Sequence, residues 1–276
     1  MGKLRVVKAG PMASIQDFGR FGFRRYGIPQ SGAMDRDFMI AANRQAGNPE
    51  NYPVIEFALA GMELEALEEA VISVIGAALK VNGEHVEKAC KVSAGDSLKI
   101  SAPGFVYGYM GMGGKLAAQE DFGSISTYER AGFGGIAGRR LKAGDMLIVD
   151  GECGEMSHVD IPQRTIVEVA EIRIMKGPEW DLLKELPSLK TFQVDATSDR
   201  MGIRLTGAKL DCDYQEIASS AVIPGTIQLP PDGQPIILMN DCQTTGGYPR
   251  IGKVMNEDLG KLAQVRPGKA IRFRLV

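Results

Sequence analysis

Short apolar runs between glycines and prolines constrain the fold of this chain more than any other feature. The 276 residues include 34 glycines and 14 prolines. Between them lie runs with the composition and alternation of strands, such as AVISVIG at 70–76, DMLIVD at 145–150 and KAIRFRLV at 269–276. The pattern predicts an all-β chain with a few short helices.

One turn-and-strand unit recurs along the chain. SAGDSLKIS, KAGDMLIVD and, more loosely, RPGKAIRFRLV each place a glycine turn before a polar residue and a short apolar strand. The repetition favours more than one copy of a similar β unit, built as a barrel or a sandwich. The polar connector from Asp150 to Thr165 is the predicted boundary between an N-terminal domain, residues 1–160, and a C-terminal domain, residues 161–276.

Two segments predict α-helices. In MDRDFMIAANRQAGN, Asp35 is placed to cap the first turn and Gly47 to end the last. In NEDLGKLAQV, Asn256 is the expected N-cap.

Two further segments predict other local structure. GPEWDLLKELPSL is expected to form a third, short helix that ends at Pro187, because proline disrupts a helix interior. Residues 230–233 are expected to form a turn between the strands GTIQL and QPIIL.

Charge and hydropathy exclude several classes of protein. The chain carries 32 Lys and Arg against 34 Asp and Glu, and no segment is dominated by basic residues, so nucleic acid is not an expected partner. The longest apolar runs are about half the ~20 residues of a membrane span. The N-terminus lacks the apolar core of a secretory signal. We therefore expect a cytoplasmic protein without a membrane partner.

Cysteine and histidine are too few and too scattered for most metal or disulfide chemistry. The four cysteines form no C-x-x-C pair, and the two histidines, His85 and His158, have no acidic or cysteine neighbour suited to a site. The sequence therefore predicts no metal site and disfavours a histidine base.

The first polar, glycine-rich patch runs from Ser14 to Asp35 and contains Gln16, Asp17 and Arg20. Glycines there allow the backbone to approach a partner closely, so the patch is a candidate surface for an anion or another protein. The alternative is a long loop in which Asp17 and Arg20 pair with each other.

The second patch, residues 123–145, combines the hydroxyls of Ser124, Ser126 and Thr127 with the glycines at positions 132, 134, 135 and 138. Successive glycine N–H groups can form a nest for an anion. The phosphate-loop pattern G-x-x-x-x-G-K-[ST] is absent, so nucleotide binding by this chain alone is not predicted.

The C-terminal half holds two more patches. In SDRMGIRLTG, Asp199 and Arg200 form either a surface ion pair or a substrate clamp, and residue type alone favours the pair. In MNDCQTTGGYPRIGKV, residues 239–254, neutral hydrogen-bonding side chains precede a glycine pair. Such side chains suit the recognition of amides and carboxylates but are poor nucleophiles without a base. A small-molecule binding loop is the expected role.

Taken together and in order, these motifs resemble one family. They are QDFGRFGFRRYGIPQSGAMD, AANRQAGN, GSISTYERAGFGGIAGRRLKAGD, SDRMGIRL and IQLPPDGQPIILMNDCQTTGGYP. The family is that of the C subunit of the ATP-dependent 5-oxoprolinase, also labelled allophanate hydrolase subunit 2, which is similar to the carboxyltransferase domain of biotin-dependent urea carboxylase. The resemblance extends from about Val7 to Phe273, with small departures at Met12, Ala13 and Lys115 outside the polar patches.

The resemblance implies two tandem cyclophilin-like β-barrel domains. It implies one component of a hydrolase, inactive alone, that works with the sister B and A subunits of the complex to open 5-oxoproline to L-glutamate with ATP hydrolysis. ATP would be bound by the complex and not evidently by this chain, which also lacks a biotin attachment site.

The residues carried over by position fall into two groups, and no catalytic role is assigned to any of them. The first group, expected to contact substrate, is Asp241, Gln243, Thr244, Thr245, Gly246, Gly247 and Tyr248. The second is Gln16, Asp17, Arg20, Ser124, Ser126, Thr127, Asp199 and Arg200, in which Arg20 or Arg200 would meet a carboxylate, a phosphate or the partner chain.

Two alternatives stay open. One is the carboxyltransferase half of a biotin-dependent enzyme similar to urea carboxylase, which would need a biotin carrier on another chain. The other is a regulatory partner that counteracts a sister inhibitor of a sensor histidine kinase.

Overall fold

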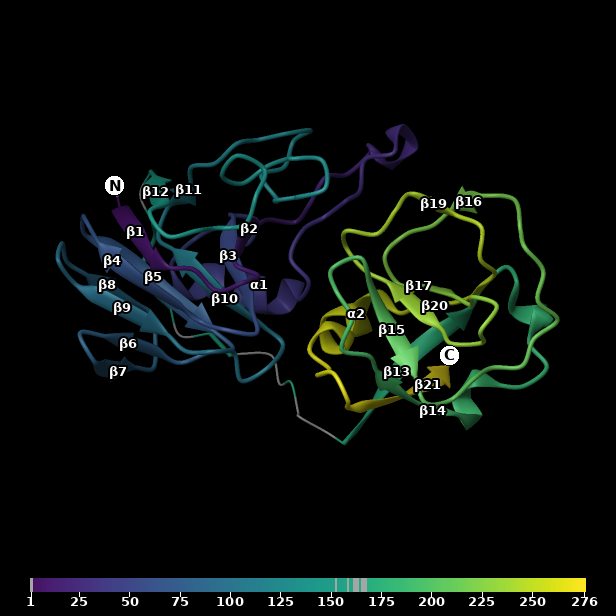
Figure 1. Ribbon diagram of the computed structural model, residues 1–276. Coiled ribbons are helices and arrows are strands. Elements are labelled where there is room, and N and C mark those ends of the chain that lie inside the picture. The colour runs from purple at the N-terminus through teal and green to yellow at the C-terminus, as the bar shows by residue number, and fades with distance from the viewer. Residues whose placement is uncertain (1, 152, 158, 161–163, 165–167) are drawn as a thin grey trace. The chain divides into compact units, whose positions relative to one another are not determined.

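The computed structural model describes residues 2–151, 153–157, 159–160, 164 and 168–276 (Figure 1). It divides into two compact units, residues 1–20 with 31–163 and residues 21–30 with 164–276. The segment 21–30, which lies in the first predicted domain by position, therefore clusters with the second unit. His158 and residue 161, at the predicted boundary, lie outside the described residues.

The first unit consists of two antiparallel sheets. The larger has the strand order β11 (Lys115–Leu116), β12 (Met146–Asp150), β1 (Gly2–Lys8), β4 (Met62–Ala66), β9 (Ser97–Ile100), β6 (Leu79–Val81) and β7 (Glu84–Val86). The smaller has the order β2 (Ser14–Gln16), β3 (Val54–Ala58), β10 (Tyr107–Met112), β5 (Ala70–Ile75) and β8 (Cys90–Val92).

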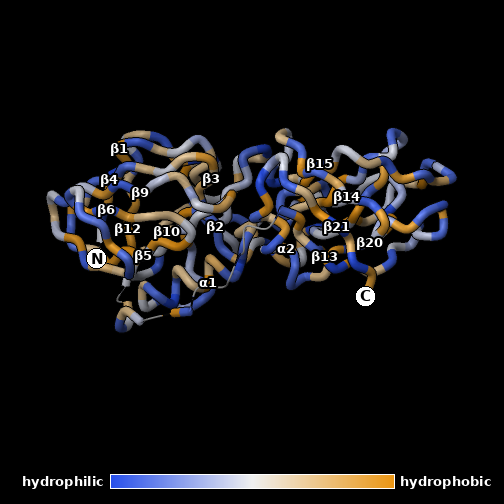
Figure 2. Tube along the Cα trace, turned by 90° about the horizontal axis from the view of Figure 1, so that it is seen from below, coloured by the Kyte–Doolittle hydropathy of each residue, from blue (hydrophilic) through white to orange (hydrophobic). Residues whose placement is uncertain are grey.

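Both sheets contribute to one apolar core. Leu4 and Leu64 come from the larger sheet and Ile15, Ile55 and Ile72 from the smaller, and each is 1% exposed or less. Burial of such a side chain stabilises the fold by about 1.5–3 kcal/mol. Hydrophobic residues accordingly run along β5 in Figure 2.

Helix α1 (Arg36–Gln45) packs on β10 and β5 of this unit. The carboxylate of Asp35 accepts a hydrogen bond from the N–H of Phe38, and Gly47 follows the helix with a φ of 77°. The predicted helix and its N-cap are confirmed.

The second unit is a closed barrel. Its strand order is β13 (Val169–Lys176), β20 (Arg250–Val254), β17 (Thr226–Gln228), β18 (Ile236–Leu238), β15 (Gly202–Thr206), β14 (Thr191–Val194) and β21 (Ala270–Leu275). Parallel pairing of β21 with β13 closes the ring, which removes the unpaired edges of an open sheet. The rings of Phe192 and Phe273 meet inside it, with centroids 5.4 Å apart. A two-stranded ribbon, β16 (Ser220–Ala221) with β19 (Thr245–Gly246), completes the sheets.

The prediction of a mostly β chain with short helices is confirmed, and so are the recurring turns. Gly95, Gly144 and Gly268 each precede a strand with a φ of 80–94°, a conformation that favours glycine. The turn at residues 230–233 closes with the N–H of Gly233 donating to the carbonyl of Pro230 at 3.0 Å, and β17 and β18 pair on either side.

Two helix predictions need correction. Helix α2 (Asn256–Ala263) has Met255 at its N-cap position, so Asn256 is its first helical residue and not its N-cap. The side chain of Asn256 instead accepts a hydrogen bond from Nζ of Lys253 at 2.7 Å.

The third predicted helix is replaced by two 3-10 turns, η2 (Trp180–Leu182) and η3 (Pro187–Leu189). Pro187 begins η3 rather than ending a helix, since proline suits a first helical position and keeps Leu186 before it extended. One more 3-10 turn, η1 (Arg24–Tyr26), lies in the segment 21–30.

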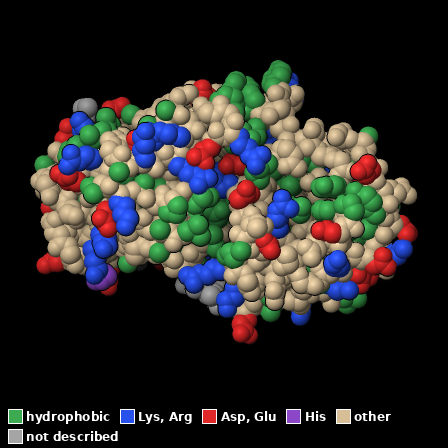
Figure 3. Space-filling model, in the orientation of Figure 1, with side chains coloured by type: hydrophobic (Ala, Val, Ile, Leu, Met, Phe, Trp, Pro, Cys, Tyr) green, Lys and Arg blue, Asp and Glu red, His purple; other side chains and the backbone are tan. Residues whose placement is uncertain are grey.

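Charged side chains of both signs are interspersed on the face drawn in Figure 3, in keeping with the net charge of −2. In the described part of the chain, no helix has the length and apolar composition needed to cross a membrane.

Candidate functional site

The predicted site residues gather in two clusters, one in each unit. In the first unit, the carboxylate of Asp17 is surrounded by donors. Its Oδ1 accepts from the hydroxyls of Ser124 and Ser126 and from the N–H of Gly19, and its Oδ2 accepts from the N–H of Ile125 at 2.9 Å. The structure thus brings Asp17 together with two serines that lie more than a hundred positions away in the sequence.

Gln16, at the end of β2, and Arg20, shortly after it, bind the loop that contains Ser124 and Ser126. Arg20 is fully buried and donates to the carbonyls of Asp121 and Ser126, and Gln16 donates to the carbonyl of Thr127 at 3.3 Å. These bonds fasten the loop after β11 onto the segment that follows β2. Direct contact of this cluster with substrate stays a prediction.

In the glycine-rich part of that loop, a backbone N–H group is already bonded to a side chain of the same loop. The N–H of Gly134 donates to Oδ2 of Asp121 at 2.8 Å. A Cβ at position 134 would lie 2.2 Å from the carbonyl oxygen of Ser126, so only glycine fits this approach. Asp121 therefore takes up one donor of the expected anion nest.

In the second unit, the pocket loop, residues 241–250, joins β18 to β20. Arg200 holds its start, donating from Nε to Oδ2 of Asp241 at 2.8 Å and from Nη2 to Oδ1 at 3.0 Å. Both side chains are about a tenth exposed. Asp199 instead accepts from the N–H groups of Met201 and Gly202. The predicted pairing of Asp199 with Arg200 is therefore wrong, because the partner of Arg200 comes from the pocket loop.

A second arginine–carboxylate pair holds the other end of the pocket loop. Arg250 donates to both carboxylate oxygens of Glu179, at 2.7 and 2.9 Å, and its N–H adds a third bond. Hydrogen bonds from Arg250 hold the pKa of Glu179 below its usual range, so the carboxylate stays ionised. Bidentate pairs of this kind fix the relative orientation of the two side chains and also stabilise the fold.

The middle of the pocket loop is supported from the segment 21–30. Nη2 of Arg24 donates to the carbonyls of Val222 and Gln243, and it lies 3.7 Å from Sγ of Cys242. Burial raises the pKa of the Cys242 thiol despite this arginine, so the thiol stays neutral at pH 7 and is a poor nucleophile.

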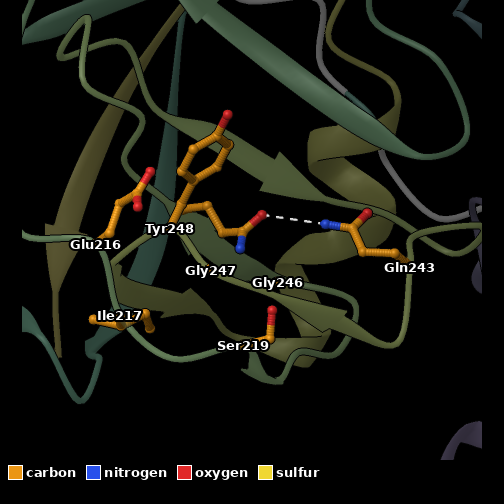
Figure 4. Close-up of a pocket in the computed structure, with 8 residues that line it drawn as sticks. Glu216, Ile217, Ser219, Gln243, Gly246, Gly247 and Tyr248 are labelled. Carbon is orange, nitrogen blue, oxygen red and sulfur yellow. Dashed lines mark hydrogen bonds between the residues drawn. The ribbon is translucent and has the colours of Figure 1, made fainter.

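Between the anchored ends, the pocket loop lines a pocket of about 310 Å³. Its lining residues are Glu216, Ile217, Ser219, Gln228, Gln243, Gly246, Gly247 and Tyr248. In Figure 4 the side chain of Gln243 points from the loop into this group, and its Nε2 donates to Oε1 of Gln228 at 3.3 Å.

Four of the seven residues predicted in the pocket loop line the pocket, and three do not. Asp241 anchors the loop, whereas Thr244 and Thr245 form backbone bonds to the ribbon strand β16 and its neighbour Val222. Glu216 and Gln228 were missed. The signal for Gln228 was a polar residue at the end of the apolar strand GTIQL; Glu216 gave no signal.

The arrangement favours binding over self-sufficient catalysis. Amide groups, one carboxylate and two hydroxyls line the pocket, and histidine and lysine are not among the lining residues. Across the described residues, no group of three or more His, Cys, Asp or Glu side chains could hold a metal ion.

Comparison with known sequences gives the class of the protein. The carboxyltransferase domain family, subdomains A and B, matches residues 26–275, and the chain belongs to this family. The resemblance drawn from the sequence motifs is thereby confirmed.

Particular relatives narrow the comparison. The chain is 39% identical to the C subunit of 5-oxoprolinase from Haemophilus influenzae, over 96% of this chain and 88% of that protein. It is 33% identical to the corresponding C subunit of 5-oxoprolinase from Escherichia coli, over 98% of this chain and 90% of that protein. Among solved structures, the Kluyveromyces lactis urea amidolyase matches 99% of this chain with a TM-score of 0.94 and 27% identity, while this chain covers 19% of that one.

Proposed function

We propose that this chain is the C subunit of an ATP-dependent 5-oxoprolinase complex in the cytoplasm, and that it works with the A and B subunits to open 5-oxoproline to L-glutamate. Its similarity to two proteins named as the C subunit of 5-oxoprolinase, over nearly the full length of each, supports the proposal. The chain alone is proposed to be inactive.

The observation that carries the proposal is the construction of the pocket. Ion pairs fix both ends of the pocket loop, and neutral amide groups are held at its centre. Such a site can hold and orient a small polar substrate, which lowers the entropic part of a reaction barrier. Because the lining residues include no general base of the histidine or lysine type, we propose that the reacting groups come from a partner chain.

The proposed reaction explains a need for ATP. A lactam is a stable amide and a poor electrophile, so its hydrolysis requires activation of the carbonyl. ATP is proposed to be bound by the complex and not by this chain.

The test is ADP release by the complex assembled from this chain and its two partners, measured with and without 5-oxoproline. We expect release that depends on 5-oxoproline, and we expect Gln243→Ala and Tyr248→Ala to abolish it. Gln193→Ala, an exposed change on β14, is the matched control and should leave release unchanged. An assembled complex without substrate-dependent ADP release would refute the proposal.

A second candidate function is the carboxyltransferase half of an enzyme similar to urea carboxylase. The family match over residues 26–275 and the TM-score of 0.94 to a urea amidolyase favour it. Transfer of a carboxyl group from a separately supplied biotinylated carrier to urea would distinguish it from the first candidate.

A further inference from the structure

Gln228 places an unused hydrogen-bond donor in the pocket of the second unit. The residue lies at the end of β17 and is 2% exposed. Its Oε1 accepts a hydrogen bond from Nε2 of Gln243 at 3.3 Å. Its Nε2 is buried and has no hydrogen-bond partner among the described residues, although the residue lines the pocket.

A buried donor without a partner is costly. Leaving such a group unsatisfied destabilises a fold by about 1–3 kcal/mol, which is why native structures pair nearly all of them. An apolar side chain of the same size would avoid this cost. A ligand atom that accepts its hydrogen bond would remove the cost.

Gly246 lets the pocket loop approach this donor closely. A Cβ at position 246 would lie 2.5 Å from Nε2 of Gln228, well inside van der Waals contact. The φ of Gly246 lies outside the left-handed region, so backbone conformation does not explain the glycine. The close approach of the loop to Nε2 of Gln228 does explain it.

The charge of the pocket narrows the class of acceptor. Among the lining residues, Glu216 is the one charged side chain, and it is negative. A carboxylate placed in this pocket would meet like charge without a cation among the lining residues, whereas the carbonyl oxygen of a neutral amide would not. The carboxylate of Glu216 can also accept a hydrogen bond from an amide N–H.

We propose that Gln228 is a specificity-determining residue, which donates from Nε2 to the carbonyl oxygen of a neutral amide or lactam group of the ligand. This rests on the proposed function for the lactam as the natural ligand, and it assigns the lactam carbonyl, rather than the carboxylate of 5-oxoproline, to the pocket of the second unit.

The test is an NMR titration that measures binding of 2-pyrrolidone, a lactam without a carboxylate, to the full chain. We expect the side-chain amide signals of Gln228 and Gln243 to shift. Gln228→Met should weaken binding about tenfold, the effect of one hydrogen bond. Gly246→Ala should weaken it at least as much, because the added methyl group would displace the donor.

Further variants and probes make the test specific. Gln228→Glu keeps the shape but replaces the donor by an acceptor, so a loss of binding with unchanged unfolding assigns the effect to the donor. Gln193→Met is the matched control. Titration with urea, as a second probe, shows whether the pocket prefers the carbonyl of a urea group or that of a lactam. Shifts of the Gln228 amide signals with either probe support its role as a donor.

Unchanged affinity in Gln228→Met and Gln228→Glu would overturn the proposal, as would acetate binding as tightly as 2-pyrrolidone. The outcome is separable from that of the proposed function. If 2-pyrrolidone binds through Gln228 while the assembled complex releases no ADP with 5-oxoproline, the proposed function falls and the donor role stands. If ADP release is normal in Gln228→Met, the donor role falls and the function stands.

Discussion

Replacement of Asp241 by asparagine removes the charge that holds the start of the pocket loop to Arg200. The wild-type pair has two bonds of 2.8 and 3.0 Å between side chains that are 12% and 11% exposed. Loss of one partner from a buried ion pair costs ~3–5 kcal/mol. Because asparagine keeps one acceptor oxygen, we expect a smaller cost, about 2 kcal/mol, borne by local opening of the loop.

Native-state hydrogen exchange measures that local opening directly. A change of about 2 kcal/mol corresponds to about 30-fold faster exchange. The N–H of Asp241, bonded to the carbonyl of Arg200, and the N–H of Val222, bonded to that of Thr244, should both show it. The N–H of Met39 in α1 should exchange at the wild-type rate and serves as the internal reference.

Two variants complete this experiment. Asp211→Asn changes a carboxylate that is 70% exposed and should leave exchange in the pocket loop unchanged. Combined with Arg200→Met, Asp241→Asn should cost less than the sum of the single changes, because the two side chains act as one pair. Exchange within threefold of wild type in Asp241→Asn would refute the view that this pair anchors the loop.

Three other predictions concern stability. Burial opposes ionisation of Asp258, but hydrogen bonds from an arginine on β13 hold its pKa below the usual range. Its carboxylate therefore stabilises the fold above its unfolded-state pKa of about 4, and this stabilisation is lost as pH falls through the lower folded-state pKa. Asp258→Asn should therefore reduce the decrease of the thermal unfolding midpoint between pH 7 and pH 3. Leu262→Ala empties a fully buried position and should lower the unfolding free energy of the second unit by about 2–4 kcal/mol, measured in urea by the fluorescence of Trp180, the one tryptophan of the chain. Gly134→Ala adds a Cβ 2.2 Å from a backbone carbonyl at a φ of 65°, and should lower the melting temperature of the first unit in calorimetry.

The local structure of this chain was predictable where one residue decides it. Asp35 caps a helix and Gly233 closes a turn because each acts on backbone groups a few positions away. The helix expected to end at Pro187 was wrong. The apolar spacing of the segment suits a helix, but the structure has the 3-10 turn η2 followed by Leu183 and Leu186 in extended conformation, and Leu186 precedes a proline.

The binding chemistry was harder to predict than the fold. The motif around Gln243 and Tyr248 marked half of the pocket, but Gln228 and Glu216 join it from other parts of the chain. Arg200 pairs with Asp241, 41 positions away, rather than with its sequence neighbour Asp199. Such pairings depend on how the barrel strands align, which could not be predicted from the residue pattern of this one sequence.

The segment 21–30 has a consequence for how the chain is made. Arg24 leaves the ribosome early, yet the carbonyls that it binds, those of Val222 and Gln243, are synthesised about two hundred residues later. At a translation rate of about 5–20 residues per second, these acceptors are synthesised at least about ten seconds after Arg24. The bonds of Arg24 to the second unit therefore form only after Gln243 has been synthesised, and a fragment of residues 164–276 would lack this support for the middle of its pocket loop.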